Sequence, residues 1–479
     1  MTAATYHGQH LGISDSRTGT NQPQHSLSSC LGSSLCVSRF PHSGRCSLIP
    51  LIFPNHHKCC RREFPKSALM TRESVMEDEK LCDAVNRHSS LSPAQVSFLT
   101  VLYLLLDVVS SLWHPYLVHM PQTYDILAMF GEFEKRALQV DEAMWVTEKA
   151  MLKAKSEWKE AHALMEDLMF KPQFLTFKAW VWAAATISSQ TMHIPWDEAG
   201  CLCLVGDLFN YDAPGMEPSG IEDLEHFLSN SSIHDTSLLN GDNNIMRLTD
   251  GWFEEDVNAY CFYSRAHYKK GDQVLLCYGI YTNLELVEHY GFLLQENPND
   301  KVFIPLEPAV YSSTSWSKES LYVHHNGKPS YALLAALRLW ATPQNKRRSV
   351  GHLVHSGSQL SADNEIFIMK WLSKTCDAVL KNLPTSIEED TLLLNAMDNS
   401  QDFSTFIEIT KLICPMEAQK LVFIRSSRRK KDKRDGRGRK GMMKVRKRMS
   451  KNYYMIYVQI KLTPIKKCIN NIHTPSFTF

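Results

Sequence analysis

Residues 270–292 read KGDQVLLCYGIYTNLELVEHYGF and give the clearest indication of the fold. Apolar and polar residues alternate over residues 257–278, as they do in half-buried strands, and residues 269–272 (KKGD) supply a turn between two of these strands. Thr282 is a suitable N-cap, and Glu285 three residues later completes a capping box. The sequence therefore predicts two strands followed directly by a short helix.

Upstream of this stretch the pattern is helical. Apolar residues recur every three or four positions over residues 124–169, and a second helical pattern follows Pro172. The longest apolar stretch, residues 98–109, is shorter than the roughly 20 residues that a membrane span needs. We therefore expect a buried helix there and no membrane contact.

The segments on either side of the predicted strands differ in character. Residues 212–256 are acidic, rich in Asn and Ser and punctuated by Gly and Pro, which favours a long surface loop. Downstream, three further helical patterns lie near residues 329–341, 361–382 and 388–413. Composition and spacing alone thus indicate a soluble α+β protein with a helical C-terminal half.

The charges are unevenly distributed along the chain. The 479 residues include 52 Lys and Arg against 51 Asp and Glu, a formal net charge of +1. Residues 425–451 hold fifteen of the basic residues and two of the acidic ones, a local charge of +13, so the rest of the chain carries −12. The segment Arg425–Lys451 is a candidate contact for nucleic acid or a nuclear import signal, and a solvated charge run is the simpler interpretation.

Composition and cysteine usage exclude several classes of protein. Hydrophobic residues make up 44% of the chain, enough for a packed core, which excludes wholesale disorder. The 13 cysteines show no paired spacing, so reduced thiols in an intracellular compartment are favoured. Cys201 and Cys203 point the same way along a predicted strand and are expected in the core. The His and Cys residues at 56–60 are neighbours in sequence, and neighbouring ligands rarely converge on one ion, so no metal site is expected.

The first 25 residues are polar and hold a single acid, Asp15. This composition favours a disordered leader, with an organelle transit peptide as the alternative. The expected location is the nucleus or the cytoplasm, and the chloroplast if the leader is a transit peptide.

Five motifs stand out along the chain. Residues 205–211 read VGDLFNY, residues 270–279 read KGDQVLLCYG, and residues 283–292 read NLELVEHYGF. Residues 113–121 (WHPYLVHMP) and 177–189 (FKAWVWAAATISS) support them. Taken in their order along the chain, the five motifs resemble those of SET-domain methyltransferases, and within these the Rubisco large-subunit methyltransferase-like class.

The resemblance implies an α+β fold, in which a SET domain of small β-sheets carries a helical insertion and is followed by an all-α substrate-binding domain. The implied division of the chain is a disordered leader at 1–25, a SET domain at 26–300, a helical substrate-binding domain at 301–422 and a basic, disordered tail at 423–479. Within the SET domain, the helical insertion falls at 124–200 and the acidic loop at 212–256.

The resemblance also implies a cofactor and roles for individual residues. S-adenosylmethionine is the implied methyl donor, and a protein carrying the acceptor lysine is the implied partner. Tyr278 is the implied catalytic residue, whose hydroxyl orients the amine near the sulfonium. Asn210, Tyr211, Gly44 and Arg45 are implied in cofactor binding, and Ser189 and Asp207 in lining the substrate channel, mainly through backbone carbonyls.

Methyl transfer fits these residue types. A lysine amine must arrive neutral at the methyl carbon, so its pKa has to be lowered by desolvation and by the positive sulfur. The enzyme therefore supplies position and a water-poor channel rather than a reactive side chain. Tyr211 stands where the family usually has His, and Gln190 where it has Arg. The change at Tyr211 leaves room for another nitrogen acceptor, such as histidine.

One region departs from the family pattern. Gly44 and Arg45 resemble the start of a G-R-G turn, but Cys46 follows them, and prolines interrupt the stretch 46–63, where two strands are expected. Because proline cannot donate to a central ladder, that stretch is not expected to form the cofactor hairpin. The runner-up function is therefore a catalytically impaired SET-fold protein that acts as a binding module.

Overall fold

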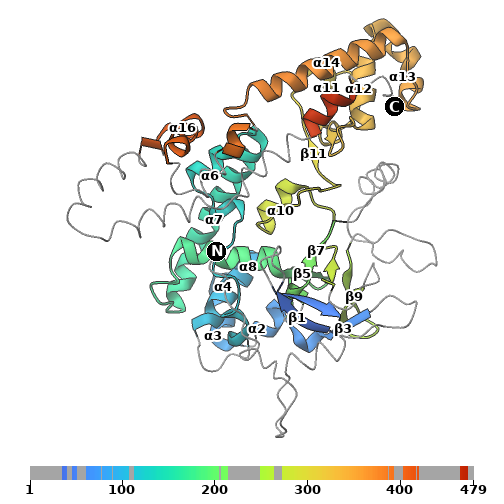
Figure 1. The fold of residues 1–479 in the computed structure, drawn as a ribbon. Coiled ribbons are helices and arrows are strands. Elements are labelled where there is room, and N and C mark those ends of the chain that lie inside the picture. Colours follow the sequence, from blue (N-terminus) through green and yellow to red (C-terminus); the bar gives the residue numbers. More distant parts are fainter. Residues whose placement is uncertain are drawn as a thin grey trace.

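The chain has a body of short strands and helices at one end and a helical body at the other (Figure 1). The computed structural model describes residues 35–39, 46–50, 61–76, 78–88, 90–106, 113–203, 206–213, 249–263, 272–386, 388–392, 403–416, 418–419 and 464–472. The predicted cofactor residues Gly44 and Arg45, the His/Cys cluster at 56–60 and the basic segment 425–451 lie outside these residues.

The strands form several small sheets, as the family resemblance implied. Two sheets have three antiparallel strands, in the orders β3-β9-β8 and β4-β6-β5, and three more have two strands each: β1-β2 and β11-β12, both antiparallel, and β7-β10, which is parallel. The bounds are β1 Leu35–Arg39, β2 Cys46–Pro50, β3 Arg61–Pro65, β4 Leu69–Met70, β5 Thr191–Ile194, β6 Asp197–Cys203, β7 Asn210–Tyr211, β8 Gly251–Glu254, β9 Ala259–Tyr263, β10 Leu275–Leu276, β11 Lys301–Val302 and β12 Val323–His324.

Two strands overlap the stretch 46–63, and they pair with other strands rather than with each other. Residues 46–50 form β2, paired with β1, and residues 61–65 form β3, paired with β9. Pro50 is the last residue of a two-stranded sheet, a position where the missing N–H is tolerated. The predicted loop 212–256 ends earlier than expected, because residues 251–254 form β8 on β9. The prediction for Cys201 and Cys203 is confirmed, since both side chains are buried in the strand core.

Helices occur in three parts of the chain, at residues 72–190, 283–289 and 308–413. Their bounds are α2 Arg72–Val75, α3 Glu79–Arg87, α4 Pro93–Leu106, α5 His114–Leu117, α6 Glu132–Ala137, α7 Asp141–Asp167, α8 Phe177–Gln190, α10 Asn283–His289, α11 Pro308–Tyr311, α12 Tyr331–Trp340, α13 Arg347–His355, α14 Ala362–Lys381 and α16 Phe403–Ile413. The sequence did not predict α13. The predicted capping box of α10 is confirmed, because Thr282 accepts from the Glu285 N–H and Glu285 accepts from the Thr282 N–H.

The first helical group encloses a core of its own. Helices α3, α4, α5, α7 and α8 bury one cluster, in which Trp180 is fully buried and its ring lies 5.6 Å from that of Phe98. Helix α4 is the buried helix that the apolar stretch predicted, and no helix among the described residues is long and apolar enough to cross a membrane. The helical part of the predicted 124–200 insertion ends at Gln190, since residues 191–203 form β5 and β6.

The C-terminal helical body contains a part of the predicted tail. Helices α11, α12 and α14 share a core with residues 464–472, which are helical; Ile465 and Cys468 are fully buried in that core. Figure 1 shows this last helix, in red, beside α11 and α12. The expectation of a disordered tail from 423 to the end is therefore wrong for residues 464–472, because their apolar face completes the helical core.

A hydrogen-bonded contact, which we call the Gln139 latch, joins the helical insertion to the C-terminal half. Gln139, between α6 and α7, donates through Nε2 to the Thr385 hydroxyl at 2.6 Å and accepts the Thr385 N–H at 3.2 Å. The Thr385 hydroxyl donates in turn to the carboxylate of the buried Asp390 at 2.6 Å. Nearby, α16 packs on α6 rather than on α12–α14 (Figure 1). Both the latch and α16 thus join the C-terminal half to the insertion.

Candidate active site

The site forms where two short parallel strands bring distant segments together. Leu275 of β10 lies opposite Asn210 of β7, and Leu276 lies opposite Tyr211. Tyr278 follows β10 by two residues, and its hydroxyl donates to the backbone carbonyl of Phe209. The pairing therefore places Tyr278, Tyr211 and Asn210 near one another.

Tyr211 and Tyr278 brace each other through backbone carbonyls. The buried Tyr211 donates through its hydroxyl to the carbonyl of Gly279 at 2.9 Å, while Tyr278 donates to the carbonyl that precedes Asn210. Their ring centroids are 5.3 Å apart. Burial, and secondarily Cys277, raises the pKa of Tyr211, so this hydroxyl remains protonated and continues to donate. The two hydrogen bonds fix both rings and direct the hydroxyl oxygens inward.

Three more aromatic rings complete a cluster around this pair. Tyr281 lies 6.3 Å and Phe292 5.9 Å from Tyr211, and Tyr290 lies 5.6 Å from Tyr278, all between ring centroids. The Tyr290 hydroxyl donates to that of Tyr281 at 3.3 Å, and burial, followed by Tyr281, raises the pKa of Tyr290. In the resulting aromatic cluster Tyr211 is buried and the other four rings are half-buried, and their electron-rich faces suit a cationic methyl donor or ammonium group.

Both Tyr-Gly pairs of the site, at residues 278–279 and 290–291, need glycine for conformational reasons. Gly279 has φ +147°, and a Cβ added there would lie 2.9 Å from the Tyr281 ring. Gly291 has φ +74°, and its Cβ would lie 3.0 Å from the backbone of Asp125 in the insertion. Only glycine fits both the backbone angle and the close approach at these positions. The glycines thus let the chain turn tightly around the aromatic cluster.

The predicted channel residues lie at the border between the strands and the helical insertion. Asp207, in a 3-10 turn at Gly206–Leu208, accepts a hydrogen bond from the Tyr116 hydroxyl of α5 at 3.2 Å. Burial, and then Asp207, raises the pKa of Tyr116. Ser189, buried at the end of α8, accepts from the Gln190 amide at 3.0 Å. The neighbouring Ser188 donates to the carbonyl of His289 at 3.1 Å, which fixes the end of α8 beside the end of α10.

Some participants were not singled out from the sequence. Tyr281 and Phe292 join the cluster through long-range ring contacts, and Tyr116 reaches Asp207 across 91 residues. Tyr116 and Phe292 lie inside two of the five motifs, but the motifs do not indicate which residues these side chains contact. Gln190, in place of the usual Arg, holds Ser189 rather than a distant group.

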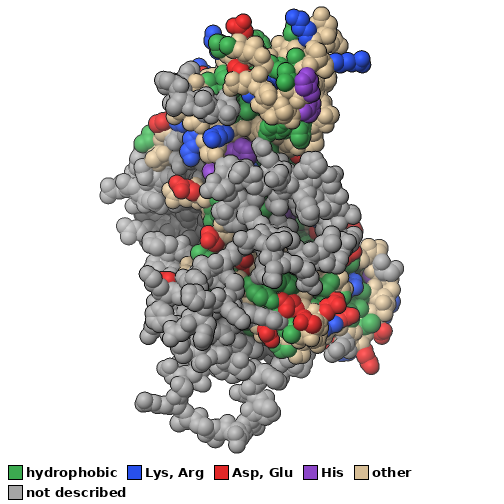
Figure 2. Space-filling view, turned by 90° about the vertical axis from the view of Figure 1, so that its right-hand side faces the viewer, with side chains coloured by type: hydrophobic (Ala, Val, Ile, Leu, Met, Phe, Trp, Pro, Cys, Tyr) green, Lys and Arg blue, Asp and Glu red, His purple; other side chains and the backbone are tan. Residues whose placement is uncertain are grey.

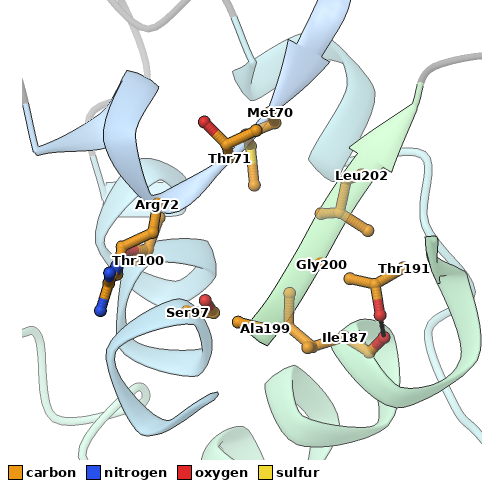
Figure 3. A pocket seen from close by; sticks show the side chains of 10 residues that line it. All are labelled: Met70, Thr71, Arg72, Ser97, Thr100, Ile187, Thr191, Ala199, Gly200 and Leu202. Carbon is orange, nitrogen blue, oxygen red and sulfur yellow. Dashed lines mark hydrogen bonds between the residues drawn. The ribbon is translucent and has the colours of Figure 1, made fainter. Parts of the chain in front are cut away.

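A small cavity lies elsewhere, between the start of α2, α4 and the β5–β6 hairpin (Figure 3). It holds about 10 Å³, room for about one water, and the Thr100 hydroxyl on its wall has no hydrogen-bond partner in the described part of the chain. Its lining includes none of the predicted site residues. We regard it as a hydration site. Within the same described residues, no group of three His, Cys, Asp or Glu side chains is placed to hold a metal.

Comparison with known proteins identifies the family. Residues 309–431 match the model of the Rubisco LSMT substrate-binding domain. The chain is 53% identical over 398 residues to Protein SET DOMAIN GROUP 40 of Arabidopsis thaliana, covering 82% of this chain and 79% of that protein. This chain belongs to the SET-domain family, in its Rubisco LSMT-like class. The family's substrate-binding domain accounts for the helical C-terminal body, and the predicted α+β fold is confirmed.

Two further relatives are more distant. The mouse actin-histidine N-methyltransferase is 23% identical over 373 residues, which span 70% of this chain and 56% of the mouse protein. A solved structure of Rubisco LSMT bound to sinefungin and monomethyllysine is 18% identical, with a TM-score of 0.50, and covers 83% of this chain and 88% of that one. At this identity the structural likeness shows the shared fold.

Proposed function

We propose that this chain is an S-adenosylmethionine-dependent protein-lysine N-methyltransferase. The observation that carries the proposal is the braced pair of Tyr211 and Tyr278 inside an aromatic cluster, found at the junction of the β7 and β10 strands of a SET fold. A tyrosine held in this way presents an oxygen at a fixed point next to a water-poor space, which is the requirement for orienting a neutral amine.

The residues present fit the cofactor. S-adenosylmethionine supplies a methyl group on a positively charged sulfur, which aromatic faces, hydroxyl oxygens and carbonyl oxygens stabilise. The aromatic cluster offers all three kinds of group around Tyr278, and the half-buried Asn210 offers an amide for the polar, amino-acid end of the cofactor. We assign Asn210 and Tyr211 to cofactor binding and Tyr278 to catalysis, and Gly44 and Arg45 remain predicted contacts outside the described residues.

Tyr278 has a specific task in this account. Its hydroxyl donates to the Phe209 carbonyl, and in this proposal the same oxygen accepts an N–H from the acceptor amine. Desolvation among the surrounding rings lowers the pKa of an arriving lysine and favours the neutral, nucleophilic form. The aromatic rings of Tyr281, Tyr290 and Phe292 exclude water from the path of the amine.

Histidine is the second candidate acceptor. It is supported by the 23% identity to a protein named actin-histidine N-methyltransferase and by Tyr211 in the usual His position. Lysine is favoured, because the solved structure of similar fold is of Rubisco LSMT with monomethyllysine. Incubation with radiolabelled S-adenosylmethionine and plant extract, followed by hydrolysis and amino-acid analysis, separates methyl-lysine from methyl-histidine.

The competing hypothesis of a binding module is tested by calorimetry with S-adenosylmethionine. Micromolar binding supports the enzyme, and the absence of measurable heat supports the module. We further propose an intracellular location, supported by eight cysteines whose thiols are free. Nucleic-acid binding by Arg425–Lys451 stays a prediction, which truncation of that segment and a salt titration would test.

A further inference from the structure

Asp250 lies where two of the small sheets meet. Its backbone carbonyl accepts the Tyr263 N–H at 2.8 Å, which continues the pairing of β8 with β9. Its backbone N–H donates to the carbonyl of Cys277 at 2.9 Å, one residue beyond the end of β10. Asp250 therefore joins the β3-β9-β8 sheet to the segment that carries Tyr278.

The carboxylate of Asp250 takes the place of a backbone acceptor. Cys277 donates its N–H to Oδ2 of Asp250 at 2.7 Å. Two residues that face each other in an antiparallel pair exchange two backbone bonds, but the carbonyl of Asp250 is bonded to Tyr263, and its side chain accepts the second bond instead. A carboxylate accepts a shorter and stronger hydrogen bond than a carbonyl does. Cys277 is thus held through both of its backbone polar groups.

Asp250 is buried, unlike the acidic residues that face water. Figure 2 shows acidic side chains gathered on the surface of the lower body, where water solvates them, whereas Asp250 is only 3% exposed. Burial of a carboxylate costs free energy unless hydrogen bonds compensate for it. The bond to the Cys277 N–H supplies such compensation, so the charge and the bond belong together.

The chain around Tyr278 is held from its other side as well. The Cys277 thiol donates to the carbonyl of Gly279 at 3.4 Å, and this carbonyl also accepts the Tyr211 hydroxyl at 2.9 Å. Both chain neighbours of Tyr278 are therefore held in place, one by Asp250 and the other by Tyr211. A misplacement of about 1 Å at a reacting centre can cost about 10²-fold in rate, so the anchoring of this backbone bears directly on catalysis.

We propose that Asp250 is a positioning residue for methyl transfer, which fixes the backbone of Tyr278 through its bond to the Cys277 N–H. This role rests on the proposed function, in which Tyr278 orients the acceptor amine. Asp250 itself contacts neither the acceptor nor the cofactor. It controls the rate of the chemical step, whereas affinity for the cofactor depends on other residues.

The test compares Asp250→Ala, which removes the acceptor, with Asp250→Asn, which retains an oxygen for the Cys277 N–H. Transfer of labelled methyl groups by the full-length protein into plant-extract protein is measured over a range of S-adenosylmethionine concentrations. Asp250→Ala should lower kcat by about tenfold or more and leave KM for S-adenosylmethionine within about twofold of the wild type. Asp250→Asn should restore kcat to within about threefold of the wild type. An equal loss of kcat in the two variants would overturn the proposal.

Asp197 is a matched control for the removal of a buried carboxylate. It is 4% exposed and accepts the backbone N–H groups of Arg72 at 3.1 Å and Ala199 at 3.0 Å, but it lies in the β4-β6-β5 sheet. Asp197→Ala should lose stability as Asp250→Ala does and keep kcat within about twofold of the wild type. A similar loss of kcat in both variants would show that Asp250 only stabilises the fold, which would overturn the proposal.

A double-mutant cycle tests whether Asp250 acts through Tyr278. In the Tyr278→Phe background, Asp250→Ala should lower the rate by no more than about twofold, because the hydroxyl that the anchor positions is already absent. A further loss as large as the one in the wild-type background would mean that the two residues act independently, and the positioning role would then be wrong.

Hydrogen exchange at residues 276–279, measured by mass spectrometry, separates the anchor from the proposed function. Asp250→Ala should raise the exchange rate there by about tenfold or more, and Asp250→Ser, with its shorter side chain, serves if the alanine variant does not fold. Unchanged exchange in the folded variant would overturn the anchor whether or not the protein transfers methyl groups. Faster exchange together with a wild type that transfers no methyl group would overturn the proposed function and leave the fixing of Tyr278 by Asp250 supported.

Discussion

The strand-built active site and the helical body of α11, α12 and α14 are held together by different interactions. Around Tyr278, two-residue strands pair over 64 residues or more, and tyrosine hydroxyls bond to backbone carbonyls. In the helical body, apolar side chains such as Leu333 and Leu372 fill the core. A substitution in the site should therefore alter the rate of methyl transfer with little loss of stability, whereas a substitution in the helical core should mainly lower the free energy of unfolding.

The largest loss of stability is expected from Ile465→Ala. This side chain is 1% exposed in the helical core, so its truncation should lower the free energy of unfolding by about 2–5 kcal/mol. Ile366→Ala, at a 51% exposed position of α14, should change it by less than about 0.5 kcal/mol. Urea unfolding followed by tryptophan fluorescence measures both. Similar values for the two variants would show that residues 464–472 are not part of the core.

The Gln139 latch should come next in size. Thr385→Val keeps the side-chain shape but removes the hydroxyl shared by Gln139 and Asp390, which leaves these two buried side chains joined only by their long hydrogen bond of 3.4 Å. The expected cost is about 1–3 kcal/mol. Gln139 has φ 58°, a strained angle for this residue, so the loss should be accompanied by faster hydrogen exchange at the α6–α7 junction. Unchanged exchange there would contradict a latch.

The latch also predicts a pH dependence. Burial raises the pKa of Asp390 above its unfolded value, and Oδ2 has no hydrogen-bond partner among the described residues. Because the folded pKa is the higher one, protonated Asp390 favours the folded state. This contribution to the free energy of unfolding is complete below the unfolded pKa near 3.8 and is lost as the pH rises through the folded pKa. Asp390→Asn should remove this loss and be more stable than the wild type at neutral pH. Parallel stability–pH curves for the two proteins would rule out this role for Asp390.

The smallest effect is expected at the start of α10. Thr282→Ala removes the side chain that accepts the Glu285 N–H, at a cost of about 1 kcal/mol. Because the Thr282 hydroxyl bonds to Glu285 of the same helix, this variant should retain cofactor binding and lose only stability. Thermal unfolding measures the stability of the variant, and calorimetry with S-adenosylmethionine on the same sample measures its cofactor binding. A loss of cofactor binding larger than the loss of stability would show that the cap belongs to the site.

The sequence predicted the helices better than the strands, for a physical reason. Helices such as α14 follow from periodicity and a local N-cap, Ser361, within one continuous segment. Strands β7 and β10 have two residues each and exist only because distant segments pair, so no local pattern marks their ends. Strand β2 is a similar case, since Pro50 excludes a central strand but not the end of a two-stranded sheet.

Motifs indicated the candidate site residues but not their contacts. Strands β7 and β10 bring Tyr278, Tyr211 and Asn210 near one another, and their hydrogen bonds with Phe209 and Gly279 need this three-dimensional pairing. The Tyr116 bond to Asp207 and the Gln139 latch join residues 91 and 246 positions apart. A single sequence carries no signal for such partners.

The central claim is that Tyr278 orients the acceptor in methyl transfer. Its most direct test is the rate of labelled methyl transfer from S-adenosylmethionine into plant-extract protein by the wild type, Tyr278→Phe and Tyr263→Phe. Tyr263 is a matched control, a strand tyrosine whose hydroxyl bonds to Glu254 away from the cluster. We expect Tyr278→Phe to lose on the order of 10²-fold in rate and Tyr263→Phe to resemble the wild type. Equal labelling by Tyr278→Phe and the wild type would contradict the account.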